Sequence, residues 1–377
     1  MDGRSTLLIL AGTILPSAVL SCAAAMVVRR MAVRWGLVDQ PDPRKVHTTP
    51  TPLGGGLAIW LGVVLPFFAG QIVLWLIAGG VVSEELLPAF ARPHIAGLAS
   101  RMASLWILLG AGTVLMVLGL LDDRFKLDWR LRLAVQFAVA AACVATQGWR
   151  LTAFLNMPLV TGVLSVIWIV ALINAFNMLD NMDGLSGGVA ALAAAFLAAV
   201  LLLAPDPSTD QPQLFVAGFL LVIVGGLLGF LWHNRPPARI FMGDAGSYFV
   251  GFSIAVATLL ATYAGYQSTT RHAILAPLFV MAVPLYDMMT VLWIRVRSGR
   301  SPFSADRNHF SHRLVELGLT KGQAVLTIYL LTATCGVGAL LLHRVDAVGA
   351  GLITLLIACV LALIAILETT ARRKLSP

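Results

Sequence analysis

Two neighbouring carboxylates, Asp122 and Asp123, stand at the end of an apolar run and are the first candidates for chemistry. At about 4 Å and an effective dielectric near 20, their repulsion is about 4 kcal/mol. Either one carboxyl is protonated or a cation lies beside them. A Mg²⁺ ion shared with substrate phosphates meets this need. The alternative interpretation is a solvated, Arg-paired helix end.

A second polar stripe finishes a later apolar run, where Asn174, Asn177 and Asp180 recur at steps of three and Asp183-Gly184 follows. At this spacing the first three side chains share one slowly drifting helix face. Amide and carboxylate oxygens are hard ligands that suit Mg²⁺. The connecting loop contains no Lys or Arg, so its two acids lack a local partner. Helix capping explains one such residue, not the whole stripe.

Basic residues form two further candidate sites. Arg44, Lys45 and His47 precede a Gly triplet that opens an apolar run, and basic groups beside a helix N-terminus suit a phosphate. The simpler alternative is a positively charged anchor beside a Gly-rich helix contact. His309 and His312 lie in the longest basic segment, which is either a surface for a diphosphate or an ordinary basic loop. Two His without Cys are too few for zinc.

Asp244 lies in a short acidic segment between two glycines, Gly243 and Gly246. It is either an N-cap of the helix that follows or a metal ligand held close to the backbone.

The elements that position these residues are membrane helices. Of 377 residues, 59% are hydrophobic and 12% are charged, against about 25% charged in soluble domains. Mean hydropathy is +0.88. These values exclude a soluble domain, a disordered chain and a fibre, and they predict an all-α, polytopic integral membrane protein. The net charge of +8 is spread between apolar runs, so it predicts membrane topology and no nucleic-acid partner.

About 20 apolar residues cross a bilayer, and the first run is too long for a signal-peptide core. With the N-terminus outside, 20 Lys and Arg residues fall on the inner side and six on the outer side, which predicts a cytoplasmic C-terminus. We expect one domain over residues 1–377 with about eleven spans. They are residues 5–28, 54–82, 102–121, 131–148, 158–177, 187–204, 213–233, 246–265, 273–294, 323–342 and 348–367.

The polar segments all fall on the predicted cytoplasmic face. Carboxylates that bind magnesium, surrounded by bases that bind phosphate, are the parts that phosphoryl transfer needs. A membrane-embedded version implies a lipid reactant. A secondary transporter is a weaker alternative, because it predicts mid-membrane ionisable groups and an internal repeat.

Five ordered segments within residues 30–320 resemble the polyprenyl-phosphate N-acetylhexosamine-1-phosphate transferases of glycosyltransferase family 4, in the WecA and TagO branch related to MraY. The segments are Arg44-Lys45-x-His47, Leu121-Asp122-Asp123-Arg124, Asn174-Ala-Phe-Asn177-Met-x-Asp180-x-x-Asp183-Gly184, Phe241-Met-Gly-Asp244-x-Gly-Ser247 and Ser301-Pro-Phe-x-Ala-Asp306-Arg307-x-His309.

The resemblance implies transfer of an N-acetylhexosamine-1-phosphate, most simply GlcNAc-1-phosphate, from a UDP-sugar to undecaprenyl or another polyprenyl phosphate. UMP is the second product, and the lipid-linked sugar starts a cell-envelope glycan. It also implies Mg²⁺ as the cofactor, with Mn²⁺ as a substitute. The protein is expected to be a multi-pass protein of the inner (plasma) membrane with its active site on the cytoplasmic face. A homodimer is a possible assembly. The alternatives are a phospho-MurNAc-pentapeptide transferase activity and an intramembrane Asp-rich prenyltransferase.

The resemblance also implies roles for individual residues. Two are expected metal ligands: Asp244 and Asn177. Five are expected in catalysis: Asp122, Asp123, Asp180, Asp183 and His309. Seven are expected to bind substrate: Arg44, Lys45, Asn174, Asn234, Phe241, Arg307 and His312. For Asp122 and Asp123 positioning is favoured over proton abstraction, since a phosphate with a second pKa near 6 hardly needs a base.

The chain departs from the family pattern at two positions. Asn181 stands where an Asp-Gly-x-Asp-Gly run has its first Gly, and we expect the turn to survive because Asn tolerates left-handed backbone geometry. The usual His-x-His-His is reduced to His309-Phe310-Ser311-His312, which places weight on His309 and leaves the role of His312 open.

Overall fold

The computed structural model describes residues 3–41, 49–89, 91–151, 155–204, 206, 211–264, 270–304 and 306–375. The helices are α1 (Gly3–Ala32), α2 (Gly55–Ala78), α3 (Ile95–Phe125), α4 (Trp129–Gln147), α5 (Pro158–Leu179), α6 (Leu185–Leu203), α7 (Leu214–Asn234), α8 (Gly243–Leu260), α9 (Ala276–Val280), α10 (Ala282–Arg297), α11 (Phe310–Glu316), α12 (Lys321–Leu341) and α13 (Ala347–Leu375). Short 3₁₀ helices are η1 (Glu84–Leu86), η2 (Arg92–His94) and η3 (Arg271–Leu275), and strands are β1 (Val38–Asp39) and β2 (Thr51–Pro52).

The long apolar runs fold as helices because hydrocarbon offers no partner for an unpaired backbone group. Within the described ranges, ten helices are long and apolar enough to cross a membrane. An eleventh span is added if η3–α9 and α10, which meet at 63°, count as one. The prediction of an all-α polytopic membrane protein with about eleven spans is therefore confirmed.

The bent span differs from the single straight run expected over residues 273–294. Pro277 lies at the start of α9 and Pro284 in the first turn of α10, on either side of Met281. Proline has no N–H to continue a helix ladder and fits most easily in the first turn of a helix. The sequence therefore starts a new helix after Met281, and the axis changes direction there.

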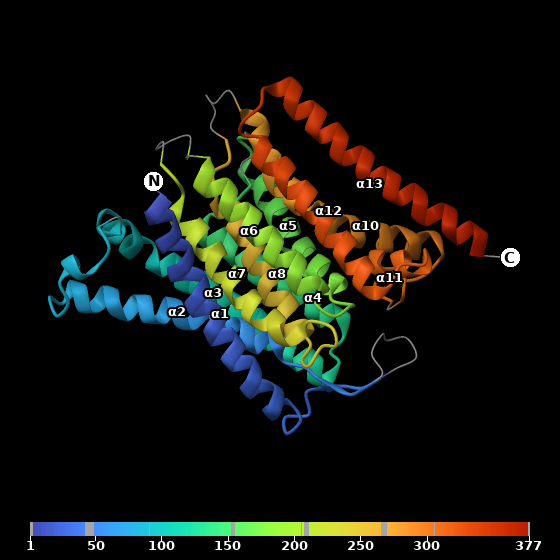
Figure 1. Ribbon diagram of the computed structural model, residues 1–377, viewed down its shortest axis with the longest axis horizontal. Helices are drawn as coiled ribbons and strands as arrows, with labels where there is room; N and C mark the ends of the chain where they lie inside the picture. Colours follow the sequence, from blue (N-terminus) through green and yellow to red (C-terminus); the bar gives the residue numbers. More distant parts are fainter. Residues whose placement is uncertain are drawn as a thin grey trace.

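The centre of the bundle is formed by α6, α7 and α8, whose most apolar windows are 72%, 72% and 78% buried inside the protein. The corresponding windows of α1 and α13 are only 11% buried. Figure 1 shows α13 running along the outside of the bundle. The outer helices therefore present their apolar residues to the surroundings, as expected for a membrane protein.

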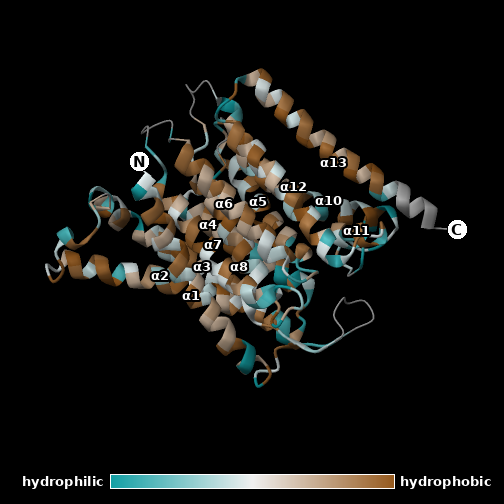
Figure 2. Ribbon diagram, in the orientation of Figure 1, coloured by the Kyte–Doolittle hydropathy of each residue, from teal (hydrophilic) through white to brown (hydrophobic). Residues whose placement is uncertain are grey.

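Hydrophilic residues gather at one end of the bundle, around α11 and the loops near α8 (Figure 2). The start of α2 belongs to this end. Gly54 adopts a φ of 100°, and the N–H groups of Gly55 and Gly56 donate to the carbonyls of Phe241 (2.9 Å) and Met242 (3.0 Å). A Cβ on Gly56 would lie 2.1 Å from the nitrogen of Gly246. The Gly triplet thus allows the close backbone approach that the sequence predicts.

Candidate active site

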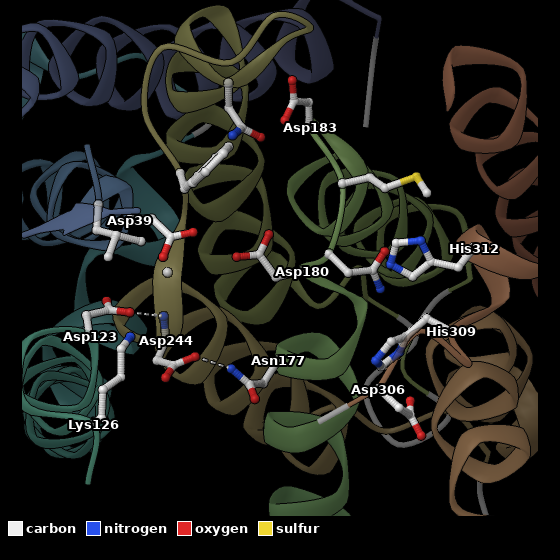
Figure 3. Close-up of a pocket in the computed structure, with 16 residues that line it drawn as sticks. Asp39, Asp123, Lys126, Asn177, Asp180, Asp183, Asp244, Asp306, His309 and His312 are labelled. Carbon is white, nitrogen blue, oxygen red and sulfur yellow. Dashed lines mark hydrogen bonds between the residues drawn. The ribbon is translucent and has the colours of Figure 1, made fainter. Parts of the chain in front are cut away.

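A cavity of about 330 Å³ opens at the polar end of the bundle. Figure 3 shows acidic side chains on several sides of it, with the two His on one side and Lys126 on the opposite side. Nine residues expected at the site line this cavity: Asp123, Asn177, Asp180, Asp183, Asn234, Phe241, Asp244, His309 and His312. They come from α3, α5, α7, α8, α11 and the connections between them, so only the tertiary fold brings them together.

The two adjacent carboxylates face different surroundings. Asp123 lines the cavity and accepts the backbone N–H groups of Asp244 (3.0 Å) and Ala245 (3.4 Å) at the start of α8. A carboxylate is stabilised there, because the first N–H groups of a helix have no partner within the helix. Asp123 therefore takes the capping role that the sequence allowed for Asp244.

Asp122 lies behind the cavity wall, buried and not solvated. It accepts a hydrogen bond from Arg132 at 2.6 Å, one from the backbone N–H of Leu127 at 2.8 Å and one from the Tyr248 hydroxyl at 3.3 Å. The expected repulsion between Asp122 and Asp123 is relieved by Arg132 on one side and by the N-terminus of α8 on the other. The carboxylate of Asp122 does not line the cavity, so its expected role beside the reacting phosphates stays a prediction.

Asp244 lies in the first turn of α8, one residue inside the helix. Its Oδ1 accepts a hydrogen bond from Asn177 Nδ2 at 2.6 Å, and its Oδ2 is 3.9 Å from Arg132. The start of α8 packs directly against α3 at Gly119. A Cβ at position 119 would lie 2.3 Å from the nitrogen of Ala245, so only glycine allows this close approach. The structure thus brings Asp244 and Asn177, the two expected metal ligands, into direct contact.

The loop between α5 and α6 carries Asp180 and Asp183. Burial, with the nearby negative charge of Asp123, raises the pKa of Asp180 to about 7. Asp183 is fixed by the backbone N–H of Ala238 at 2.9 Å. The left-handed geometry expected at Asn181 is wrong: Gly184 adopts it instead, with a φ of 75°.

The wall at α11 presents His309 and His312. His309 Nδ1 lies 3.1 Å from Asp287 Oδ2, and the other Asp287 oxygen accepts the N–H of Phe310 at 2.5 Å. This contact orients the imidazole and leaves Nε2 for a ligand. Burial and the neighbouring His309 lower the pKa of His312 to about 4, so it is neutral at pH 7.

The loop before α11 is held by Asp306. Burial alone would raise the pKa of Asp306, but hydrogen bonds from Arg295 (3.0 Å) and Asn308 (2.8 Å) outweigh it and lower the pKa to about 2. Asp306 lines the cavity, yet both of its oxygens accept hydrogen bonds from the loop and α10. Its main task is therefore to shape the segment that leads into His309.

Some of the expected residues lie elsewhere. Asn174 does not line the cavity, because its amide donates to Gln136 (2.7 Å) and to the Val170 carbonyl (2.8 Å) deeper in the bundle. Arg307 is exposed and is not part of the cavity wall. The expected substrate-binding roles of these two residues stay predictions, because the structure shows only that neither side chain lines the cavity.

Asn234 lines the cavity but uses both ends of its amide within the protein. Its Oδ1 accepts the N–H of Gly184 at 2.9 Å, and its Nδ2 donates to the Ile240 carbonyl at 2.8 Å. It therefore joins the α5–α6 and α7–α8 connections. Arg44 and Lys45 lie outside the described residues, so their expected roles stay predictions.

Four functional candidates were missed by sequence reasoning: Asp39, Lys126, Arg132 and Asp287. Asp39 ends β1, which pairs with β2 and so reaches the cavity. Lys126 follows α3 with a φ of 54° and also lines the cavity. Lys126 follows the paired acids by only three residues in the sequence, and this proximity could have indicated that it belongs to the same site. The contacts of Arg132 and Asp287 cross between helices and have no counterpart in local spacing.

The donor set suits a hard cation that arrives with its phosphates. Within the described ranges, no group of three or more His, Cys, Asp or Glu is arranged to hold a metal by itself. Mg²⁺ commonly uses one or two carboxylates, waters and substrate phosphates. Asp123, Asp244 and the amide oxygen of Asn177 offer such ligands at one cavity wall, and their charge is only partly balanced by Arg132 and Lys126.

Comparison with known proteins identifies the family. The model of glycosyl transferase family 4 matches residues 105–262. The chain is 34% identical over 326 residues to a probable undecaprenyl-phosphate N-acetylglucosaminyl 1-phosphate transferase of Bacillus subtilis, covering 84% of this chain and 80% of the relative. This chain belongs to glycosyl transferase family 4.

Two more relatives agree with this assignment. The transferase is 35% identical over 350 residues to a decaprenyl-phosphate N-acetylglucosaminephosphotransferase of Mycobacterium tuberculosis, covering 86% of this chain and 80% of that one. It is 32% identical over 319 residues to an undecaprenyl-phosphate alpha-N-acetylglucosaminyl 1-phosphate transferase of Escherichia coli, covering 81% and 76%. The family match contains the acidic part of the transferase cavity, including Asp123, Asn177, Asp180 and Asp244.

Proposed function

We propose that this transferase moves GlcNAc-1-phosphate from UDP-GlcNAc to undecaprenyl phosphate or a similar polyprenyl phosphate. A phosphate oxygen of the lipid forms a bond to the β-phosphorus of the UDP-sugar, the bond from that phosphorus to the bridging oxygen breaks, and UMP leaves. The observation that carries the proposal is the contact of Asp123, Asp244 and Asn177 in a cavity faced by His309 and Lys126. The names of the relatives support a polyprenyl phosphate acceptor and a transferred N-acetylglucosamine phosphate group.

Asp123, Asp244 and Asn177 would hold Mg²⁺, or Mn²⁺ in its place. The ion, when bound, neutralises phosphate charge during transfer. Lys126, on the same side of the cavity as Asp123, contacts a phosphate, and Lys45 does the same for the lipid. His309, oriented by Asp287, presents Nε2 to the sugar diphosphate. These residues position two anions and offset their repulsion, which is most of what phosphoryl transfer requires.

The proposed reaction takes place at the cytoplasmic face of a bacterial inner membrane. The excess of Lys and Arg on the polar side of the chain supports this placement, because it predicts an outer N-terminus and an inner C-terminus. A polyprenyl chain would then stay in the bilayer while its phosphate enters the polar end of the bundle. The homodimer stays a prediction.

Purified transferase with labelled UDP-GlcNAc, undecaprenyl phosphate and Mg²⁺ tests the proposal. We expect label in the lipid fraction, loss of transfer with EDTA and recovery with excess Mg²⁺. Absence of lipid-linked label under all these conditions contradicts the proposal. A parallel reaction with UDP-MurNAc-pentapeptide tests the alternative donor, and a preference for that donor would replace GlcNAc in the assignment.

A further inference from the structure

A hydrogen bond joins two walls of the cavity through residues with no assigned role. Ser311 Oγ lies 2.5 Å from Asn181 Oδ1, although the residues are 130 positions apart. Asn181 stands between Asp180 and Asp183, and Ser311 stands between His309 and His312. All four of these flanking residues line the cavity. The contact therefore connects the α5–α6 loop with the start of α11.

The orientation of both side chains is determined by their surroundings. Asn181 Nδ2 donates to the Met178 carbonyl at 2.9 Å, so the amide oxygen is the end that faces Ser311. Ser311 is completely buried, and its hydroxyl cannot turn to water. A buried donor and a fixed acceptor make each partner costly to remove alone.

The joined walls lie away from Lys126. In Figure 3, His309 and His312 stand on one side of the cavity, Asp123 and Lys126 stand on the other side, and Asp180 lies between them. The contact between Asn181 and Ser311 links the loop of Asp180 and Asp183 to the segment of the two His. The wall of Asp123 and Asp244 is held by separate contacts between α3 and α8.

We propose that Asn181 and Ser311 form a positioning pair that sets the distance between the two walls that bind the sugar nucleotide. This inference rests on the proposed function, in which the His wall binds the sugar diphosphate. Asn181 lines the cavity and Ser311 lies behind it, and the role assigned to both is to position the walls and not to take part in the transfer. The pair acts on donor binding and leaves binding of the lipid phosphate unchanged.

Steady-state kinetics with both substrates varied test the pair. Ser311→Ala is expected to raise KM for UDP-GlcNAc about tenfold, because a displacement well below 1 Å is costly at such a site. KM for undecaprenyl phosphate is expected to stay within about twofold of the wild-type value, because changes at one site have little effect on a distant, independent site. Asn181→Ala removes the other side chain of the contact and is expected to show the same selective rise in KM for UDP-GlcNAc. This second variant provides the test if Ser311→Ala does not accumulate in the membrane.

The double variant Asn181→Ala/Ser311→Ala removes both side chains of the contact together. It is expected to raise KM for UDP-GlcNAc by less than the product of the two single effects, since the effects of residues in contact are not additive. Ser100→Ala is the matched control, because the Ser100 hydroxyl is exposed and bonds within its own helix at 2.8 Å.

Two results would overturn the pair. One is an unchanged donor KM in Ser311→Ala and Asn181→Ala. The other is an equal loss for both substrates together with a lower melting temperature, which indicates a purely structural contact. In either case the wild-type protein still transfers GlcNAc-1-phosphate. A wild-type protein that transfers nothing contradicts the proposed function instead, so the two failures are distinguishable.

Discussion

Asp122 and Asp123 show how residues of one type and neighbouring position acquire different tasks. Asp123 points into the cavity and caps α8, whereas Asp122 is buried against Arg132. The side chains of consecutive helical residues leave the helix about 100° apart, so a cavity on one side of α3 can be reached by only one of them. Asp123 can therefore contact a ligand in the cavity, whereas Asp122 supports the packing of the helix end.

Removing the charge of Asp123 is expected to abolish most transfer. Asp123→Asn keeps the size of the side chain but loses a metal ligand and weakens the cap of α8. We expect kcat to fall about 100-fold or more. Asp128→Asn is the matched control. Asp128 caps α4 by accepting the backbone N–H of Arg130, and an Asn side chain can cap a helix in the same way. Equal activity of the two variants would remove Asp123 from the mechanism.

Asp287 is expected to act through His309. Asp287→Asn places an amide where the imidazole has its acceptor, so the ring loses its fixed orientation. We expect kcat/KM for UDP-GlcNAc to fall about 10- to 100-fold, as for other residues that orient a functional His. Asp346→Asn, near the start of α13, is the control. A pH profile and kcat/KM identical to those of wild type would argue against this positioning role.

At the scale of elements, glycines decide how closely α2, α3 and α8 approach. A Cβ on Gly56 or Gly119 would overlap the backbone at Ala245 and Gly246. The start of α8, which carries Asp244, is thus held between two helices by direct backbone contact. The site is built where helices pack most tightly, so its geometry depends on residues that carry no functional group.

Gly119→Ala is expected to displace Asp244. The added methyl group would lie 2.3 Å from the Ala245 nitrogen, so α3 and α8 must move apart. We expect transfer to fall at least about tenfold even where the protein still inserts and purifies, since displacements of 1 Å cost about 100-fold. Gly110→Ala on the same helix has nothing within 4 Å of its new methyl group and is expected to retain activity. Full activity of Gly119→Ala would show that this approach is adaptable.

The loop before α11 depends on the buried pair of Arg295 and Asp306, which is 3.0 Å long. Arg295→Gln leaves a buried carboxylate without its cation, and such losses cost about 3–5 kcal/mol. We expect a lower free energy of unfolding in SDS titrations, whereas Arg297→Gln on the exposed face of α10 is expected to match wild type. The pKa of Asp306 is lowered to about 2, so this contribution is present above about pH 4 and is lost as pH falls through about 2. An unchanged unfolding free energy in Arg295→Gln would contradict this role.

On the scale of the whole molecule, hydrophilic residues are most concentrated at one end of the bundle, whereas the helices themselves are largely hydrophobic (Figure 2). This asymmetry fits an enzyme whose lipid substrate stays in the bilayer while the nucleotide comes from water. The buried centre of α6, α7 and α8 supplies a rigid support for the cavity. The bent span of α9 and α10 ends beside the cavity and carries Asp287, which contacts His309, and Arg295, which contacts Asp306.

The predicted orientation can be measured with single cysteines in a variant that lacks Cys22, Cys143, Cys335 and Cys359. Arg92→Cys is expected to react with a membrane-impermeant maleimide in intact cells. Arg124→Cys and Arg300→Cys are expected to react only after permeabilisation, because they lie on the side of the Lys and Arg excess. Labelling of Arg124→Cys and Arg300→Cys from opposite sides would contradict both the topology and the convergence at the cavity.

The sequence by itself determined the class of the protein and the identity of most cavity residues. Apolar runs of span length specify helices, because hydrocarbon leaves the backbone no other way to satisfy its polar groups. Asp123, Asn177, Asp180 and Asp244 could be recognised because acidic and amide groups at the ends of such runs need a reason, whereas His309 was identified through the resemblance to the family.

Only the tertiary structure decided which of these side chains face the cavity. Asn174 bonds to Gln136, Asp122 bonds to Arg132, and Ser311 bonds to Asn181, and each contact joins two different elements of the fold. The rotation of each helix is set by close packing at glycines and by buried polar partners, and neither can be read from local spacing. A few tens of degrees of rotation separate a residue that binds substrate from one that supports it.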